Sequence, residues 1–158
     1  MKKLKPFLVI AFFLALIFVL VYFTENKTEV VVSDSDHDAK VRLAGEILEV
    51  KIADDATERA KGLSGVNGIT TDWGMLFVFE TPGVYAFWMK DMNFPIDIIW
   101  FDEVGKVVYI KSDARPESYP ESFMPPKEKT SKYVLEVFSG FSLKHNLQVG
   151  DAIEFLPK

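Results

Sequence analysis

From residue 47 onward, apolar residues come in alternating runs or short blocks of strand length. Residues 47–53, ILEVKIA, alternate between the two sides of an extended chain, a pattern typical of a half-buried strand. The blocks at 75–80, 85–89 and 96–101 are more continuously apolar, and Gly or Pro follows or separates them. These patterns predict a mainly β fold: a compact antiparallel β-sandwich or barrel, jelly-roll-like, with one or two short helices.

Local signals place the remaining elements. Asp54 or Asp55 can cap a short helix over 56–61, and Gly62 can end it. Two hairpins are expected, one joining 75–80 to 85–89 and one joining 96–101 to 106–111. The Pro-rich stretch 113–130 predicts a long surface loop. The other expected elements are a strand over 133–137, a helical turn over 141–146 and a last strand over 152–156.

The N-terminus predicts a single transmembrane helix. Residues 7–23 form a run of 17 residues without a charge, rich in Phe, Leu, Ile and Val. Such a helix covers roughly 25 Å, near the lower limit for crossing a hydrocarbon core. No Ala-x-Ala pattern of small residues follows the run, which favours an uncleaved signal anchor. Lys2, Lys3 and Lys5 precede it, so the positive-inside rule puts the N-terminus in the cytoplasm.

The rest of the chain divides into a spacer and one domain. Residues 1–23 are the membrane anchor, and 24–40 form an acidic flexible linker without convincing periodicity. Residues 41–158 are long enough for one globular domain with its own core, and too short for two. The expected location is therefore the cell membrane, with a single pass and an extracytoplasmic β-rich domain.

Composition excludes several kinds of chemistry. The chain has no cysteine, which rules out disulfides, thiolate nucleophiles and cysteine-ligated metal clusters. Its net charge is −5, and the three N-terminal lysines leave −8 for the remainder. An acidic domain without a basic stripe is a poor match for a phosphate backbone, so no nucleic-acid partner is expected. No motif for a hydrolase, nucleotide or metal site is present, and we expect neither a cofactor nor a metal site.

Several motifs resemble those of one known family. They are ATERAKGLSG at 56–65, DWGMLFVFE at 72–80, FWMKDMNFPIDIIWFDEVGKV at 87–107, YVLEVFSG at 133–140 and VGDAIEF at 149–155. In this order they resemble the domain of unknown function 192 family, over nearly the whole of 46–156. The resemblance implies a single compact β-rich domain, often exported or tethered in bacteria and archaea, with no established biochemical activity.

The candidate site lies around residues 88–97, where polar side chains interrupt an aromatic run. Burying Lys90, Asp91 or Asn93 without partners would be costly, so they must reach solvent at a turn or find partners. Asp97 and Glu136 are carboxylates inside apolar strands, where a structural ion pair or turn-capping role is the alternative to ligand contact. The candidate ligand-binding residues are Arg59, Trp88, Lys90, Asp97 and Glu136.

We therefore predict a membrane-tethered binding module for an envelope component, a glycan or a peptide. Trp88 would supply a flat platform for the ligand, with core packing as the alternative. A second class is a glycan-directed hydrolase with Asp97 and Glu136 as acid and base, although no catalytic motif identifies an enzyme. A third is a Cu(I)-handling protein, for which the methionines also have a gap-filling alternative. The methionines concerned are Met75, Met89, Met92 and Met124.

Overall fold

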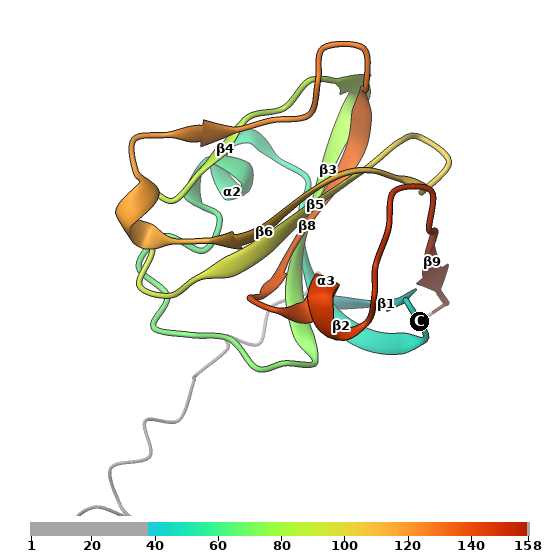
Figure 1. The fold of residues 1–158 in the computed structure, drawn as a ribbon, viewed down its shortest axis with the longest axis horizontal. Coiled ribbons are helices and arrows are strands. Elements are labelled where there is room, and N and C mark those ends of the chain that lie inside the picture. Colours follow the sequence, from blue (N-terminus) through green and yellow to red (C-terminus); the bar gives the residue numbers. More distant parts are fainter. Residues whose placement is uncertain (1–37, 158) are drawn as a thin grey trace, which may run out of the picture. The chain divides into compact units, whose positions relative to one another are not determined.

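The computed structural model describes residues 38–157, so the predicted membrane anchor and most of the predicted linker lie outside the described residues. Among the described residues, no helix has the length and apolar character needed to cross a membrane. The described part is mainly β, with two short α-helices (Figure 1). Its elements are β1 Asp38–Leu43, β2 Glu46–Ala53, α2 Ala56–Lys61, β3 Trp73–Gly83, β4 Phe87–Trp88, β5 Ile96–Phe101, β6 Val107–Ala114, the 3-10 helix η1 Pro116–Ser118, β7 Ser122–Phe123, β8 Ser131–Phe138, α3 Phe141–Lys144 and β9 Ile153–Leu156.

Seven strands form one curled sheet, a half-barrel with the order β6-β5-β8-β3-β2-β1-β9 (Figure 1). Neighbouring strands are antiparallel except β2 and β3, which pair in parallel. A parallel pair needs a crossover connection, and α2 lies within it. The purely antiparallel topology predicted above is therefore wrong at this one pair.

The predicted hairpin between 75–80 and 85–89 is wrong. β2 pairs with the first half of β3, over residues 73–77, and β8 pairs with its other edge. The segment after β3 does not pair back onto that strand, and β4 instead pairs with β7 in a separate two-stranded sheet. The other predicted hairpin, β5 with β6, is confirmed.

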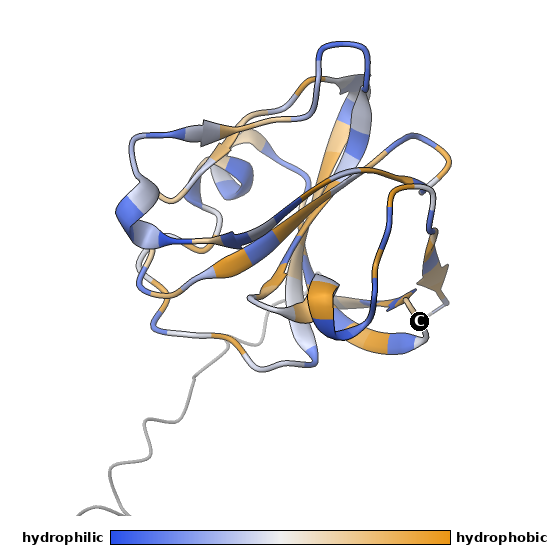
Figure 2. Cartoon of the chain, in the orientation of Figure 1, coloured by the Kyte–Doolittle hydropathy of each residue, from blue (hydrophilic) through white to orange (hydrophobic). Residues whose placement is uncertain are grey.

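The core occupies both faces of the seven-stranded sheet, and this half-barrel is found in place of the predicted sandwich or jelly roll. Every residue of β5 is buried, as expected for a strand covered on two sides. One cluster includes Phe77, Ile98 and Trp100, and the other includes Leu76, Ile99 and Phe101. Figure 2 shows the central strands rich in hydrophobic residues, whereas α2 and the loop from β7 to β8 are mostly hydrophilic.

Of the elements in the N-terminal part of the domain, one helix was predicted correctly and one strand was missed. The helix over 56–61 is confirmed, with the Asp55 carboxylate accepting a hydrogen bond from the Glu58 N–H at 2.8 Å. The strand β1 was not predicted, and residues 38–40, assigned to the linker, belong to it. The alternation of apolar and polar residues in β1 is too short to indicate a strand by itself. β1 joins the sheet by pairing with β2 on one edge and β9 on the other.

Gly74 in β3 lies close to the neighbouring strand β8, so we predict that Gly74→Ala destabilises the domain. A Cβ atom at Gly74 would lie 2.8 Å from the backbone oxygen of Glu136 and 3.0 Å from Cγ1 of Val137. The overpacking should cost about 1–3 kcal/mol in the free energy of unfolding. Gly68→Ala is the control, because its Cβ would meet no atom within 4 Å. Equal urea-unfolding midpoints for the two variants would contradict this close packing.

Candidate functional site

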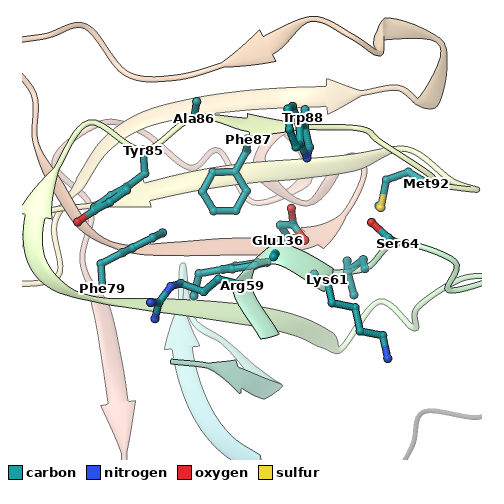
Figure 3. Close-up of a pocket in the computed structure, with 14 residues that line it drawn as sticks. Arg59, Lys61, Ser64, Phe79, Tyr85, Ala86, Phe87, Trp88, Met92 and Glu136 are labelled. Atoms are coloured by element: carbon teal, nitrogen blue, oxygen red, sulfur yellow. The ribbon is translucent and has the colours of Figure 1, made fainter. Parts of the chain in front are cut away.

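A cavity of about 310 Å³ opens on the sheet face that carries Phe77 and Ile98. It lies between α2 with the turn that follows it, β3, β4 and the centre of β8 (Figure 3). Its lining is formed by Arg59, Ala60, Lys61, Gly62, Leu63, Ser64, Phe77, Phe79, Tyr85, Ala86, Phe87, Trp88, Met92 and Glu136. This volume is within the usual range for small-ligand sites.

Glu136 carries a buried carboxyl oxygen that has no hydrogen-bond partner among the described residues. Its residue is only 4% exposed, and its Oε2 atom is buried and unpaired among the described residues. Strand alternation puts it on the same face as Val134, and its register partners Met75 and Ile98 belong to the same core cluster. Figure 3 shows the carboxyl group directed into the cavity. Buried polar groups are almost always paired in native proteins, so this one marks a candidate site.

Burial raises the pKa of Glu136 from its ordinary value of 4.5 to about 8. Desolvation disfavours the charged form, and no neighbouring cation offsets it, even though Arg59 and Lys61 line the same cavity. The carboxyl group is therefore mainly protonated at neutral pH. In that state it can donate one hydrogen bond and accept others, and a cation entering the cavity would favour its ionisation.

Arg59 lies on the last turn of α2, with its guanidinium group occupied by the backbone. It donates a hydrogen bond to the carbonyl oxygen of Val78 at 2.9 Å and another to that of Asp54. The guanidinium also lies over the ring of Phe79, 5.2 Å from its centroid. Figure 3 shows it on the Phe79 side of the cavity, away from the Glu136 carboxyl. Arg59 thus fastens the helix to β3 and forms part of the wall.

Aromatic rings form much of the remaining wall. Phe79 and Tyr85 are stacked, with centroids 3.5 Å apart and an interplanar angle of 9°. Phe87 packs edge-on against Phe77 at 4.9 Å, which holds β4 over the sheet. Trp88 comes next and is 54% exposed, so it forms part of the rim. These rings offer both apolar contact and π faces to a ligand.

Asp97 is buried on the opposite face of the sheet. It pairs in register with Val137, whereas Glu136 pairs with Ile98, so the two carboxyl groups point in opposite directions. Its carboxylate accepts hydrogen bonds from three backbone N–H groups: that of Asp113 at 2.9 Å, that of Gly140 at 3.1 Å and that of Ser142 at 2.8 Å. These contacts tie the start of α3 and the end of β6 to β5. The acid–base alternative, which needs the two carboxyl groups to face one another, is therefore wrong.

The polar residues after Trp88 form a turn beside the cavity. The Ser64 hydroxyl donates to the Lys90 carbonyl oxygen at 3.0 Å, and the Gly65 N–H donates to that of Asp91 at 2.8 Å. The Asn93 amide donates to the Val66 carbonyl oxygen at 2.9 Å. Lys90 is exposed and does not line the cavity. Of the predicted site residues, the structure brings together Arg59, Trp88 and Glu136 and separates Lys90 and Asp97 from them.

The methionines considered for copper have different surroundings. Met75, Met89 and Met92 belong to the core cluster on the cavity side, and only Met92 of these lines the cavity. Met124 is exposed. This distribution favours the gap-filling interpretation of the core methionines.

Sequence reasoning did not assign site roles to Phe79, Tyr85, Phe87 or Ser64. Phe77 and Phe79 alternate on β3 with Met75, and Met75 pairs in register with Glu136. That alternation was visible in the sequence. The pairing of β3 with β8, which places these rings beside Glu136, was not.

The fold and site together define a class: a mainly β domain built on one seven-stranded half-barrel sheet, with a buried carboxyl group in an aromatic-lined cavity. The chain belongs to the domain of unknown function 192 family (DUF192), whose model, described as "Uncharacterized ACR", matches residues 39–155. The family predicted from the sequence motifs is confirmed. A search of the curated proteins finds no match.

Two solved structures share this fold. One is a proposed transcription regulator from Sinorhizobium meliloti 1021, with 28% sequence identity and a TM-score of 0.70, covering 78% of this chain and 97% of its own. The other is a protein of unknown function from Novosphingobium aromaticivorans DSM 12444, with 24% identity and a TM-score of 0.68, covering 79% of this chain and 94% of its own. Both structures support the fold of this chain. At 24% identity, the second supports nothing beyond the fold.

The raised pKa of Glu136 makes folding stability fall as pH rises. The unfolded chain releases this proton near pH 4.5, whereas the folded chain keeps it until about pH 8, so stability decreases through that window. Glu136→Gln removes the effect. We predict that the stability of this variant relative to the parent increases by roughly 3–5 kcal/mol between pH 5 and pH 8, measured by urea unfolding. A relative stability that is the same at both pH values would contradict a buried, unpaired carboxyl group.

Asp97→Asn should destabilise the domain at neutral pH by about 2–4 kcal/mol. Both oxygens of Asp97 accept backbone hydrogen bonds, so an amide NH₂ in either orientation must face an N–H donor. Asp102→Asn is a matched control, because a single oxygen of Asp102 accepts from both Val104 and Lys106 and the amide retains that oxygen. Thermal unfolding of both variants tests the difference. Similar losses in the two would argue against a scaffold role for Asp97.

Proposed function

We propose that this chain is a membrane-tethered binding module whose cavity holds part of an envelope component, a glycan or a peptide. The observation that carries the proposal is the unpartnered Glu136 carboxyl group in an aromatic-lined cavity. Leaving such a group buried costs free energy, and a bound ligand that donates hydrogen bonds to it would recover that cost.

The form of the cavity supports binding of one ligand group at a time. A volume of about 310 Å³ accommodates one side chain or one sugar ring. Trp88 at the rim is an exposed aromatic of the kind that carries binding energy in many interfaces. Glu136 is the only carboxyl group that lines this cavity among the described residues, so the lining favours recognition over two-carboxylate hydrolysis.

The tether and the location rest on the sequence. The uncharged run 7–23 and the lysines before it support a single-pass anchor with the N-terminus in the cytoplasm. The domain would then lie on the extracytoplasmic side of the membrane, where envelope glycans and peptides would be available as ligands. The Sinorhizobium relative is described as a proposed transcription regulator, but the negative charge of this chain gives no support for contact with DNA.

Trp88→Ala should weaken ligand binding tenfold or more, because the ligand loses an aromatic contact at the rim. The variant should keep nearly the same unfolding temperature, since Trp88 is largely exposed. The test is a thermal-shift and fluorescence titration of the 158-residue chain in detergent with chitooligosaccharides and with short peptides of mixed sequence. A ligand that binds the native state raises the unfolding temperature.

Leu143→Ala is the control for this titration. Leu143 is an apolar residue of α3 that is 81% exposed and does not line the cavity. Loss of binding in Trp88→Ala but not in Leu143→Ala supports the site. Equal binding by both variants, or no binding of either ligand class by the parent chain, would contradict the proposed function.

A further inference from the structure

Among the described residues, no cation pairs with Glu136. Arg59 is directed to the Val78 and Asp54 carbonyl oxygens and to the Phe79 ring. Lys61 also lines the cavity, but Figure 3 shows its ammonium group pointing away from the Glu136 carboxyl. Neither residue forms a salt bridge with Glu136 among the described residues. A positive group that reaches this carboxyl would therefore have to come from the ligand.

Most of the side chains that line the cavity are apolar. The two hydroxyl groups of the lining already donate elsewhere: Ser64 to the Lys90 carbonyl oxygen and Tyr85 to the Thr81 carbonyl oxygen at 2.6 Å. A sugar ring carries hydroxyl groups on every side and would leave several without partners. An alkyl chain that ends in one charged group would fill the same space, and only that end group would need a polar partner. This contrast favours a peptide side chain over a glycan.

We propose that the cavity binds a lysine side chain of an envelope peptide, with the alkyl chain along the aromatic wall and the ammonium group at the Glu136 carboxylate. This inference rests on the proposed function and names its ligand class. An aromatic ring face that the cation passes or approaches in the cavity would add attraction, which is strongest where water is excluded. The ammonium group also provides the hydrogen-bond donors that Oε2 lacks.

Binding of the cation is coupled to loss of a proton. In the free protein the Glu136 carboxyl is mainly protonated at pH 7, because burial raises its pKa to about 8. When the ammonium group enters, the carboxyl O–H bond breaks, the proton passes to a buffer base and the carboxylate pairs with the ligand. The ligand keeps its own charge throughout, so binding at pH 7 should release about one proton.

The test compares three small probes by calorimetry with the 158-residue chain in detergent. The probes are N-acetyl-lysine methylamide, N-acetyl-norleucine methylamide, which lacks only the ammonium group, and N-acetylglucosamine, an uncharged sugar. We expect the lysine probe to bind at least tenfold more tightly than the other two. Its binding enthalpy should differ between phosphate and Tris at pH 7 by the amount that release of about one proton predicts, because these buffers have different ionisation enthalpies.

Two carboxyl variants separate the site from general charge effects. Glu136→Gln should bind the lysine and norleucine probes equally and lose the buffer dependence. Glu80→Gln should retain both properties, because Glu80 is exposed and does not line the cavity. Unfolding curves of both variants verify that each is folded.

The remaining outcomes distinguish this inference from the proposed function. If lysine and norleucine probes bind equally to the parent chain and Trp88→Ala weakens both, the inference is wrong and the binding module stands. If N-acetylglucosamine binds more tightly than the lysine probe, the inference is also wrong and the ligand is a glycan. If the chain binds none of the probes, and neither the chitooligosaccharides nor the mixed peptides, both proposals are wrong.

Discussion

The parallel crossover from β2 through α2 to β3 is the constraint on which the cavity depends. It places β3 inside the sheet, with β2 and β8 on its two edges, and it brings α2 over the same face as Glu136. After β3 the chain leaves the seven-stranded sheet, and β4 pairs with β7 in a second, two-stranded sheet. The cavity lies between the segment that contains β4, the helix α2 and the seven-stranded sheet (Figure 3).

Two buried carboxyl groups show how the surroundings decide the role of the same chemistry. Asp97 and Glu136 belong to neighbouring strands, yet they lie on opposite faces of the sheet. Asp97 meets three backbone N–H groups, so its charge is compensated and it joins α3 and β6 to the sheet. Glu136 meets apolar and aromatic side chains, and its Oε2 atom has no partner among the described residues. The first carboxyl group supports the fold, and the second is the centre of the proposed binding site.

Local signals predicted the elements well and their arrangement less well. The cap at Asp55, the β5–β6 hairpin and the mainly β class follow from neighbouring residues, and all are confirmed. The half-barrel sheet with core on both faces was not predicted, because a continuous apolar run such as β5 fits both a sandwich and a strand covered on two faces. Part of the site could be predicted, because Arg59, Trp88 and Glu136 stood out as polar or aromatic interruptions. The rest depended on pairing between distant strands.

The most direct test of the account is the titration of the Glu136 side-chain carboxyl carbon by NMR in the ligand-free chain. An unpaired carboxyl group buried in this cavity should titrate with a pKa of about 8. Glu136→Gln assigns the signal by its disappearance. A midpoint near the ordinary value of 4.5 would mean that the group is solvated or paired, and it would contradict the site on which the proposed function depends.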